Sequence, residues 1–175
     1  MRGFAGAAGR RLPWSVSHRR IPVAIHPSDS LAQRNAEAAV LLELDRQLGF
    51  AVRGEWVAVG DGCHINVDGI NRDHRFLCEV FSRIGKLQAA QVEKVASDIL
   101  KLTFLAQTLG GPWRKAMCFA SDEAANVLRN RSWLGKAAKA SDIEIIVVKL
   151  PPDLHQEVVA AQVRQMMVNK VRNDG

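Results

Sequence analysis

The feature that most constrains the fold is a pair of β-like runs, residues 63–67 and 76–81, joined by a polar turn. The second run is apolar on both faces, which is typical of a strand in the middle of a covered sheet. Asp68 closes the first run, and Glu79 stands inside the second. A buried carboxylate is costly unless a charged or hydrogen-bonding group compensates it. The sequence therefore predicts a hairpin in which two acids converge and at least one needs a compensating partner.

Helix and strand patterns surround this hairpin. A helix is expected over residues 31–48, and Ser30 followed by Gln33 resembles a capping box at its start. The order of elements predicts an α/β domain with a central mixed sheet flanked by helices on both faces. The remaining elements are expected at 55–59 (strand), 88–109 (helix), 115–120 (strand), 121–129 (helix), 143–150 (strand) and 151–171 (helix).

Charge divides the chain into two parts. Residues 1–28 contain five arginines and no acid, whereas residues 29–175 carry 19 basic and 18 acidic side chains. The net charge of +6 therefore resides mainly in the first segment. We interpret that segment as a basic arm outside the fold, open to three explanations: a flexible arm, a targeting sequence or an over-long translated start. Residues 29–175 are expected to form one domain, since a chain of this length can bury a single core.

Hydropathy and cysteine usage bear on location. No apolar run approaches the ~18–20 residues that a membrane span requires, so no membrane partner is expected. Three cysteines (Cys63, Cys78 and Cys118) are scattered singly through apolar segments, without a CxxC pair. Such a set suits a reducing compartment better than a disulfide framework. A cytoplasmic location is therefore expected.

A third acid joins the two in the hairpin. Counting 100° per residue places Glu37 on the apolar, leucine-bearing stripe of the first helix. With Asp68 and Glu79 it would form an all-oxygen site, which suits Mg²⁺ or Mn²⁺. Such an ion would offset the burial of the acids, lower the pKa of a bound water and stabilise charge on a phosphate.

The element order and the acids, from about residue 31 to residue 120, resemble the PD-(D/E)xK superfamily, the restriction-endonuclease-like nucleases. The resemblance implies an αβββαβ core, here followed by a C-terminal helix–strand–helix extension. By this resemblance Asp68 would be the aspartate of the motif and Glu79 the acid of its (D/E)xK element. Glu37 matches an acid of the first helix, and Gln91 matches a polar residue early in the second core helix. The implied activity is metal-dependent cleavage of phosphodiester bonds in DNA or RNA.

One position departs from the motif. Phe81 stands two residues after Glu79, where the motif has its lysine. Lys86, in the following turn, and Lys94, on the next helix, are the candidates for a displaced lysine, although Gln91 is better aimed at the site than Lys94. Two functions follow: a nuclease with a displaced lysine, or a catalytically inactive nuclease-fold module that binds nucleic acid or a protein partner, with Phe81 filling the vacated position.

A purely structural explanation, in a protein that holds no metal, also stays open. Glu79 could pair with Arg75 or Arg83, and Asp68 could cap the turn through backbone hydrogen bonds. Glu37 could simply be favoured by the helix dipole. Without an arginine or a metal nearby, the pKa of Glu79 is expected to rise through desolvation and through repulsion from Asp68.

Overall fold

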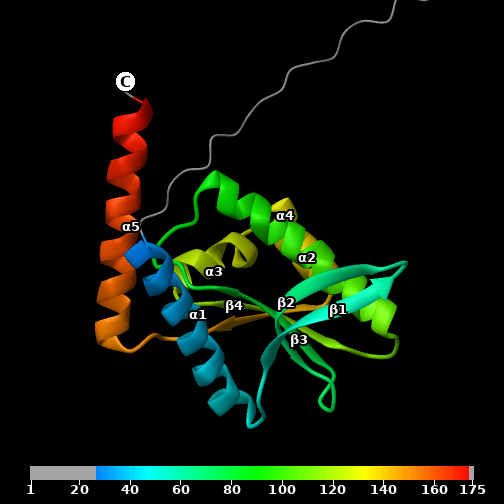
Figure 1. Ribbon diagram of the computed structural model, residues 1–175. Coiled ribbons are helices and arrows are strands. Elements are labelled where there is room, and N and C mark those ends of the chain that lie inside the picture. The colour runs from blue at the N-terminus through cyan, green and yellow to red at the C-terminus, as the bar shows by residue number, and fades with distance from the viewer. Residues whose placement is uncertain (1–26, 174–175) are drawn as a thin grey trace, which may run out of the picture.

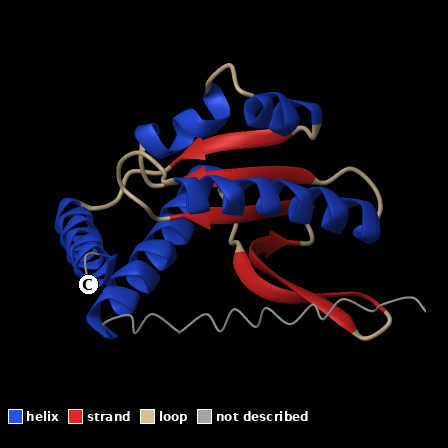
Figure 2. Ribbon diagram, turned by 90° about the horizontal axis from the view of Figure 1, so that it is seen from above, coloured by secondary structure: helices blue, strands red, loops and turns tan. Residues whose placement is uncertain are grey.

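The structure is a computed structural model that describes residues 27–173, with side chains described for residues 31–164. A five-stranded mixed sheet, in the order β1-β2-β3-β4-β5, is flanked by helices, which confirms the predicted α/β class (Figures 1 and 2). The elements are α1 (Pro27–Leu48), β1 (Arg53–Gly60), β2 (Cys63–Asn71), β3 (Phe76–Phe81), α2 (Ala89–Leu109), β4 (Arg114–Phe119), α3 (Asp122–Arg129), α4 (Trp133–Ala140), β5 (Ile143–Val147) and α5 (Pro152–Asn173).

Strand β3 is the centre of the sheet. It pairs antiparallel with β2 on one side and parallel with β4 on the other. All six of its residues are buried, as expected from the apolar character of both its faces. Strands β1 and β2 form a twisted antiparallel hairpin at one edge of the sheet (Figure 2), and β5 forms the other edge.

Each face of the sheet carries its own apolar core. Helices α2, α3 and α4 cover one face, where Leu77 and Phe81 of β3 join the core. Helices α1 and α5 cover the other, where Phe76 and Val80 point. Successive side chains of a strand point to opposite faces, so β3 contributes to both cores. The same alternation sends Glu79 to the α2 face.

Helix α1 differs from its prediction in two ways. It begins at Pro27, a residue that suits the first turn of a helix, so Ser30 lies inside the helix and the predicted capping box is wrong. The buried stripe is also displaced, and Glu37 lies beside it, partly buried. Small side chains, which allow close packing, supply most of the true stripe: Ala32, Ala36, Val40 and Leu44.

Two further boundaries differ. Strand β2 continues to Asn71, so Asp68 lies inside it and does not end it. Pairing between β2 and β3 covers only Gly69–Asn71, and Asp68 therefore stands where the two strands separate. Helix α4 was not predicted from the sequence; the Ser132 hydroxyl caps its start by accepting a hydrogen bond from the Gly135 amide at 3.1 Å.

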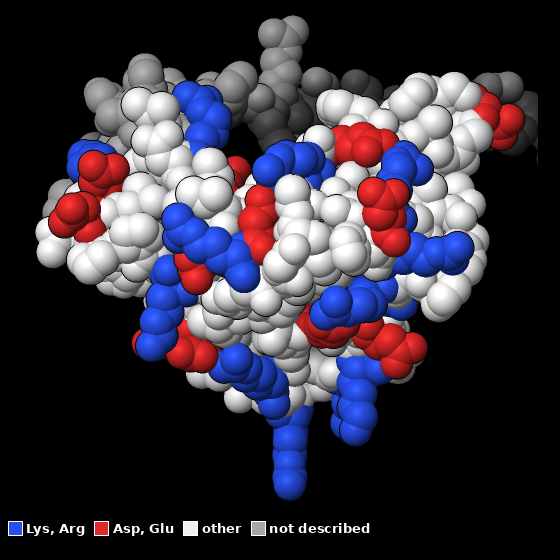
Figure 3. Space-filling model, turned by 90° about the horizontal axis from the view of Figure 1, so that it is seen from below, with Lys and Arg blue, Asp and Glu red and all other residues white. Residues whose placement is uncertain are grey.

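The predicted basic arm falls almost entirely on residues 1–26, which lie outside the described residues; residues 27 and 28 belong to α1. Within the described part of the chain, no helix is both long and apolar enough to cross a membrane. On the face seen in Figure 3, basic and acidic side chains are interspersed. This mixture agrees with the near balance of charge over residues 29–175.

Candidate active site

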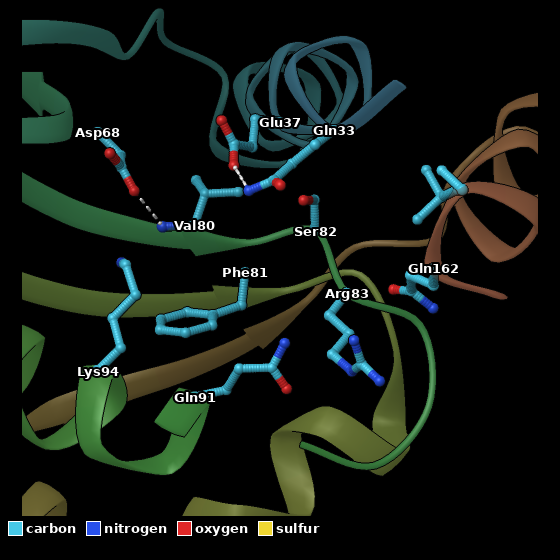
Figure 4. A pocket seen from close by; sticks show the side chains of 12 residues that line it. Gln33, Glu37, Asp68, Val80, Phe81, Ser82, Arg83, Gln91, Lys94 and Gln162 are labelled. Atoms are coloured by element: carbon cyan, nitrogen blue, oxygen red, sulfur yellow. Dashed lines mark hydrogen bonds between the residues drawn. The ribbon is translucent and has the colours of Figure 1, made fainter. Parts of the chain in front are cut away.

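Asp68 and Glu79 meet where β2 separates from β3. The Asp68 amide donates a hydrogen bond to Glu79 Oε1 at 3.3 Å. The Val80 amide donates one to Asp68 Oδ2 at 2.9 Å, drawn in Figure 4. The ladder between the strands has ended at this point, so carboxylate oxygens satisfy the backbone amides that the ladder leaves unpaired. The structure thus brings the two predicted acids together.

The cation that compensates Glu79 comes from α2. Glu79 is fully buried, and Lys101 Nζ lies 2.6 Å from its Oε2. The same ammonium lies 3.4 Å from Asp98 Oδ1 and donates to the Asn66 carbonyl at 3.2 Å. The charged partner of Glu79 is therefore a lysine that the sequence did not single out, in place of the arginines or the metal that were considered.

Burial governs the ionisation of this pair. Desolvation raises the pKa of Glu79 to about 7 and the Asp68 carboxylate adds to the rise, while Lys101 opposes it. The expected direction and both expected causes are confirmed. For Lys101, burial lowers the pKa, but the close contact with the Glu79 carboxylate and the charges of Glu79 and Asp98 outweigh burial and leave the pKa above its ordinary value. Perturbed carboxylates of this kind cluster at functional sites.

A second lysine of α2, Lys94, lies beside the Phe81 ring. Lys94 Nζ lies 4.6 Å from the centroid of the Phe81 ring and 2.6 Å from Asp98 Oδ2. Lys94, Asp98 and Lys101 succeed one another at intervals of four and three residues, so they share one side of the helix. Asp98, itself buried, bridges the two ammonium groups. Helix α2 therefore brings two cations to the side of β3 that carries Glu79.

A cavity of about 280 Å³ opens beside the acids, between α1, β3, α5 and the start of α2 (Figure 4). Four of the predicted site residues line it: Glu37, Asp68, Gln91 and Lys94. Glu79 is fully buried and does not line it. Asp68 lines the cavity and its amide contacts Glu79, so the cavity and the buried Glu79–Lys101 pair are neighbours.

The other predicted residues have separate local roles. Glu37 Oε1 accepts a hydrogen bond from Gln33 Nε2 at 3.0 Å. Gln91 Oε1 accepts one from the Gln88 amide at 2.8 Å, as part of the capping box that starts α2. Lys86 lines a different, mainly apolar cavity against α3 and α4. Lys94 therefore lines the same cavity as Glu37 and Asp68, whereas Lys86 lines a different one.

Among the described residues, no three His, Cys, Asp or Glu side chains gather into a metal-holding group. Mg²⁺ and Mn²⁺ take as few as one or two carboxylates and keep several waters. Asp68 lines the cavity, where such waters have room, whereas Glu79 is fully buried behind it. Glu79 Oε2 receives no well-directed hydrogen bond, although Lys101 lies close to it. An ion at this place would share Oε2 with the Lys101 ammonium.

Comparison with known proteins identifies no relative: no protein family, no curated protein and no solved structure matches this chain. Its function is therefore inferred from the residues of the site.

Asp98 and Lys101 are the site residues that sequence reasoning missed. Their signal was the spacing from Lys94, which places all three on one side of the helix, next to the apolar stripe. An acid between two lysines on such a flank is also the pattern of an ordinary solvated face. Only the burial of Asp98 and the contact with Glu79 distinguish the two cases.

Proposed function

We propose that the domain is a restriction-endonuclease-like, divalent-metal-dependent nuclease in which lysines of α2 replace the motif lysine. The observation that carries this proposal is the buried Glu79, held between the Asp68 amide and the Lys101 ammonium beside a cavity. Buried ion pairs are poor stabilisers, and apolar residues of similar volume often serve stability as well or better. A core that keeps such a pair next to a cavity favours a chemical role for it.

Asp68 and Glu79 would hold a Mg²⁺ or Mn²⁺ ion, and Glu37 would act through the waters of that ion. The ion supplies an activated water and neutralises charge that develops on the phosphate. The proposed metal site rests on two carboxylates that backbone amides hold in place. The Val80 amide holds Asp68, and the Asp68 amide holds Glu79.

The two lysines have different tasks in this proposal. Lys101, mostly buried, opposes the rise in the pKa of Glu79 and so favours the ionised form that binds a metal. Lys94 is more exposed and lines the cavity, where its charge can meet a phosphate in the transition state. Asp98 contacts both ammonium groups and keeps them on the same side of α2.

The catalytically inactive module remains the second candidate because of Phe81. This ring is nearly buried and stacks on Phe119 with centroids 5.5 Å apart. It therefore fills the position of the motif lysine as a core residue. In that case the cavity would bind nucleic acid or a protein partner without cutting.

Cleavage assays on generic DNA and RNA in Mg²⁺ or Mn²⁺ test the proposal. Lys94→Ala should lower the rate by about 100-fold or more, as expected for a positioned charge, and Asp68→Asn should abolish cutting. Lys86→Ala is the matched control, because that lysine lines the other cavity, and it should cut like the wild type. A wild type that cuts neither substrate would favour the inactive module.

Metal binding has its own readout. An ion that binds only the native state raises the melting temperature, so wild type should show a Mn²⁺-dependent rise that Asp68→Asn lacks. If the wild type binds Mn²⁺ without cutting, Phe81→Lys restores the lysine of the motif. Cleavage gained by that variant would identify a nuclease that has lost its activity.

A further inference from the structure

Resting on the proposed nuclease function, we infer that the substrate is a single strand of nucleic acid that lies along β3, with Arg83 binding a phosphate next to the one that is cut. Paired duplex is excluded from the cavity. Three features support this inference: the helices that wall the cavity, the chemistry of its lining and the way in which the Arg83 loop is fixed.

The wall is formed by α1 and α5, which pack side by side (Figure 1). Gln33 and Glu37 of α1 and Val158, Ala161 and Gln162 of α5 line the cavity. A helix with its side chains is ~10–12 Å across and packed helices lie ~8–10 Å apart, so the pair spans roughly 20 Å. The major groove of a DNA duplex is only about 12 Å wide. Because the pair is wider than that groove, we expect it to keep a duplex backbone away from Asp68.

The lining of the cavity matches the chemistry of a nucleotide. Val158 and Ala161 offer an apolar surface on one side, and Lys94 and Arg83 offer cations. A nucleotide combines an apolar base face with a charged phosphate, so both kinds of lining are used.

Arg83 stands beyond the end of β3, at the opposite end of the cavity from Asp68 (Figure 4). It is three residues past Val80, whose amide holds Asp68, and the reach of the chain puts the two positions at most about 10 Å apart. Its Nε makes one long contact, 3.4 Å, with the Lys86 carbonyl. No carboxylate among the described residues forms an ion pair with its guanidinium. Arg83 is therefore placed to bind a phosphate other than the one at Asp68.

The loop that carries Arg83 is fixed from two sides. Gln162 of α5 accepts a hydrogen bond from the Ile84 amide at 3.0 Å and donates one to the Ile84 carbonyl at 3.1 Å. Ser121, the N-cap of α3, accepts a hydrogen bond from the Gly85 amide at 3.2 Å. A loop held in this way loses little further freedom on binding. Gln162 is thus a positioning residue for Arg83.

Fluorescence anisotropy with labelled oligonucleotides tests the inference, using Ca²⁺ to prevent cutting. A single strand of DNA or RNA should bind about 10-fold or more tightly than a blunt duplex of the same sequence. Removing one phosphate contact should lower the slope of log K against log salt by about 0.7 for a single strand. Arg83→Ala should show that loss, whereas Arg131→Ala, an exposed arginine outside the cavity, should not.

Gln162→Ala separates positioning from binding. It should weaken single-strand binding as Arg83→Ala does, and it should also speed hydrogen exchange at the Ile84 amide, which Arg83→Ala should leave unchanged. Because the exchange rate is measured without nucleic acid, it reports on the loop independently of activity.

The outcomes distinguish the two proposals. Duplex bound or cut as well as a single strand overturns the single-strand inference and leaves the nuclease intact. Equal losses in Arg83→Ala and Arg131→Ala overturn the assignment of Arg83. Tight single-strand binding without any cleavage in Mg²⁺ or Mn²⁺ overturns the nuclease and leaves the binding site. If neither nucleic acid is bound or cut, both proposals fail.

Discussion

Two ion pairs of this protein, one buried and one exposed, show how burial changes the contribution of an ion pair to stability. Lys101 and Glu79 join α2 to the interior of the sheet, with Glu79 fully buried. Arg114 and Glu144 join β4 to β5 at the surface, where the guanidinium makes two parallel hydrogen bonds of 2.9 Å to the carboxylate. The surface pair has the better hydrogen-bond geometry, because bidentate contacts are the stronger kind.

Burial, and not hydrogen-bond geometry, decides how much the loss of each ion pair would change the stability of the protein. About half of the Arg114 side chain is exposed, and water screens and replaces the contact, so exposed pairs contribute little. Water cannot replace Lys101 beside a buried carboxylate. The protein depends on the buried pair because one partner without the other leaves a charge inside the core.

Removing the buried cation should have the largest effect. Above the pKa of Glu79, at about pH 8, Lys101→Met leaves the ionised Glu79 without its ammonium and should lower the free energy of unfolding by about 3–5 kcal/mol. Urea denaturation measures the change. The double variant Lys101→Met/Glu79→Leu should recover most of that loss, since no charge is left buried. A double variant as unstable as the single one would show that Lys101 matters for packing and not for its charge.

The pH dependence of stability should come next in size. The pKa of Glu79 is about 7 in the folded protein and near 4.5 without the fold. Between these values the folded state keeps a proton that the unfolded state has released, so the free energy of unfolding falls as pH rises. The contribution of the Glu79 proton to the free energy of unfolding is fully present below about pH 4.5 and is lost by about pH 7. This change is on the order of 3 kcal/mol.

Urea unfolding at a series of pH values checks this expectation. Glu79→Gln is the control, because the amide cannot titrate and should remove the decline between pH 4.5 and 7. If wild type and Glu79→Gln gave parallel curves across that range, Glu79 would ionise in the folded protein as easily as in water. The role assigned to burial would then be wrong.

The sequence predicted the burial of Glu79 but not its pairing with Lys101. Glu79 was expected to be buried because its strand is apolar on both faces, and Asp68 was expected nearby because consecutive antiparallel strands bring such residues together. Both expectations depend on local pattern. The contact of Lys101 depends on how α2 crosses the sheet and on the reach of a long side chain, which no local periodicity encodes.

Other misses have the same physical origin. The core stripe of α1 consists mainly of small residues, so counting leucines displaced it and placed Glu37 too centrally. Strand β2 was ended too early because Asp68 and Gly69 are poor strand formers, although Gly69 pairs with β3 and the flanking Val67 and Ile70 pair with β1. Tertiary contacts override propensity at these positions.

The smallest effect is expected at the surface pair. Arg114→Ala should lower the free energy of unfolding by no more than about 1 kcal/mol, the upper range for exposed ion pairs. Part of that loss will come from the ring of Phe76 and not from pairing with Glu144, because the guanidinium also lies 5.3 Å from the centroid of that ring.

Glu144→Gln separates the two contributions, because it removes the charge of the partner and keeps the ring contact. Urea denaturation in low salt and in 1 M salt should give a smaller difference between wild type and Glu144→Gln at high salt, since the screening length falls to about 3 Å. A loss at Arg114 as large as that at Lys101 would show that geometry, and not burial, sets the importance of an ion pair in this fold.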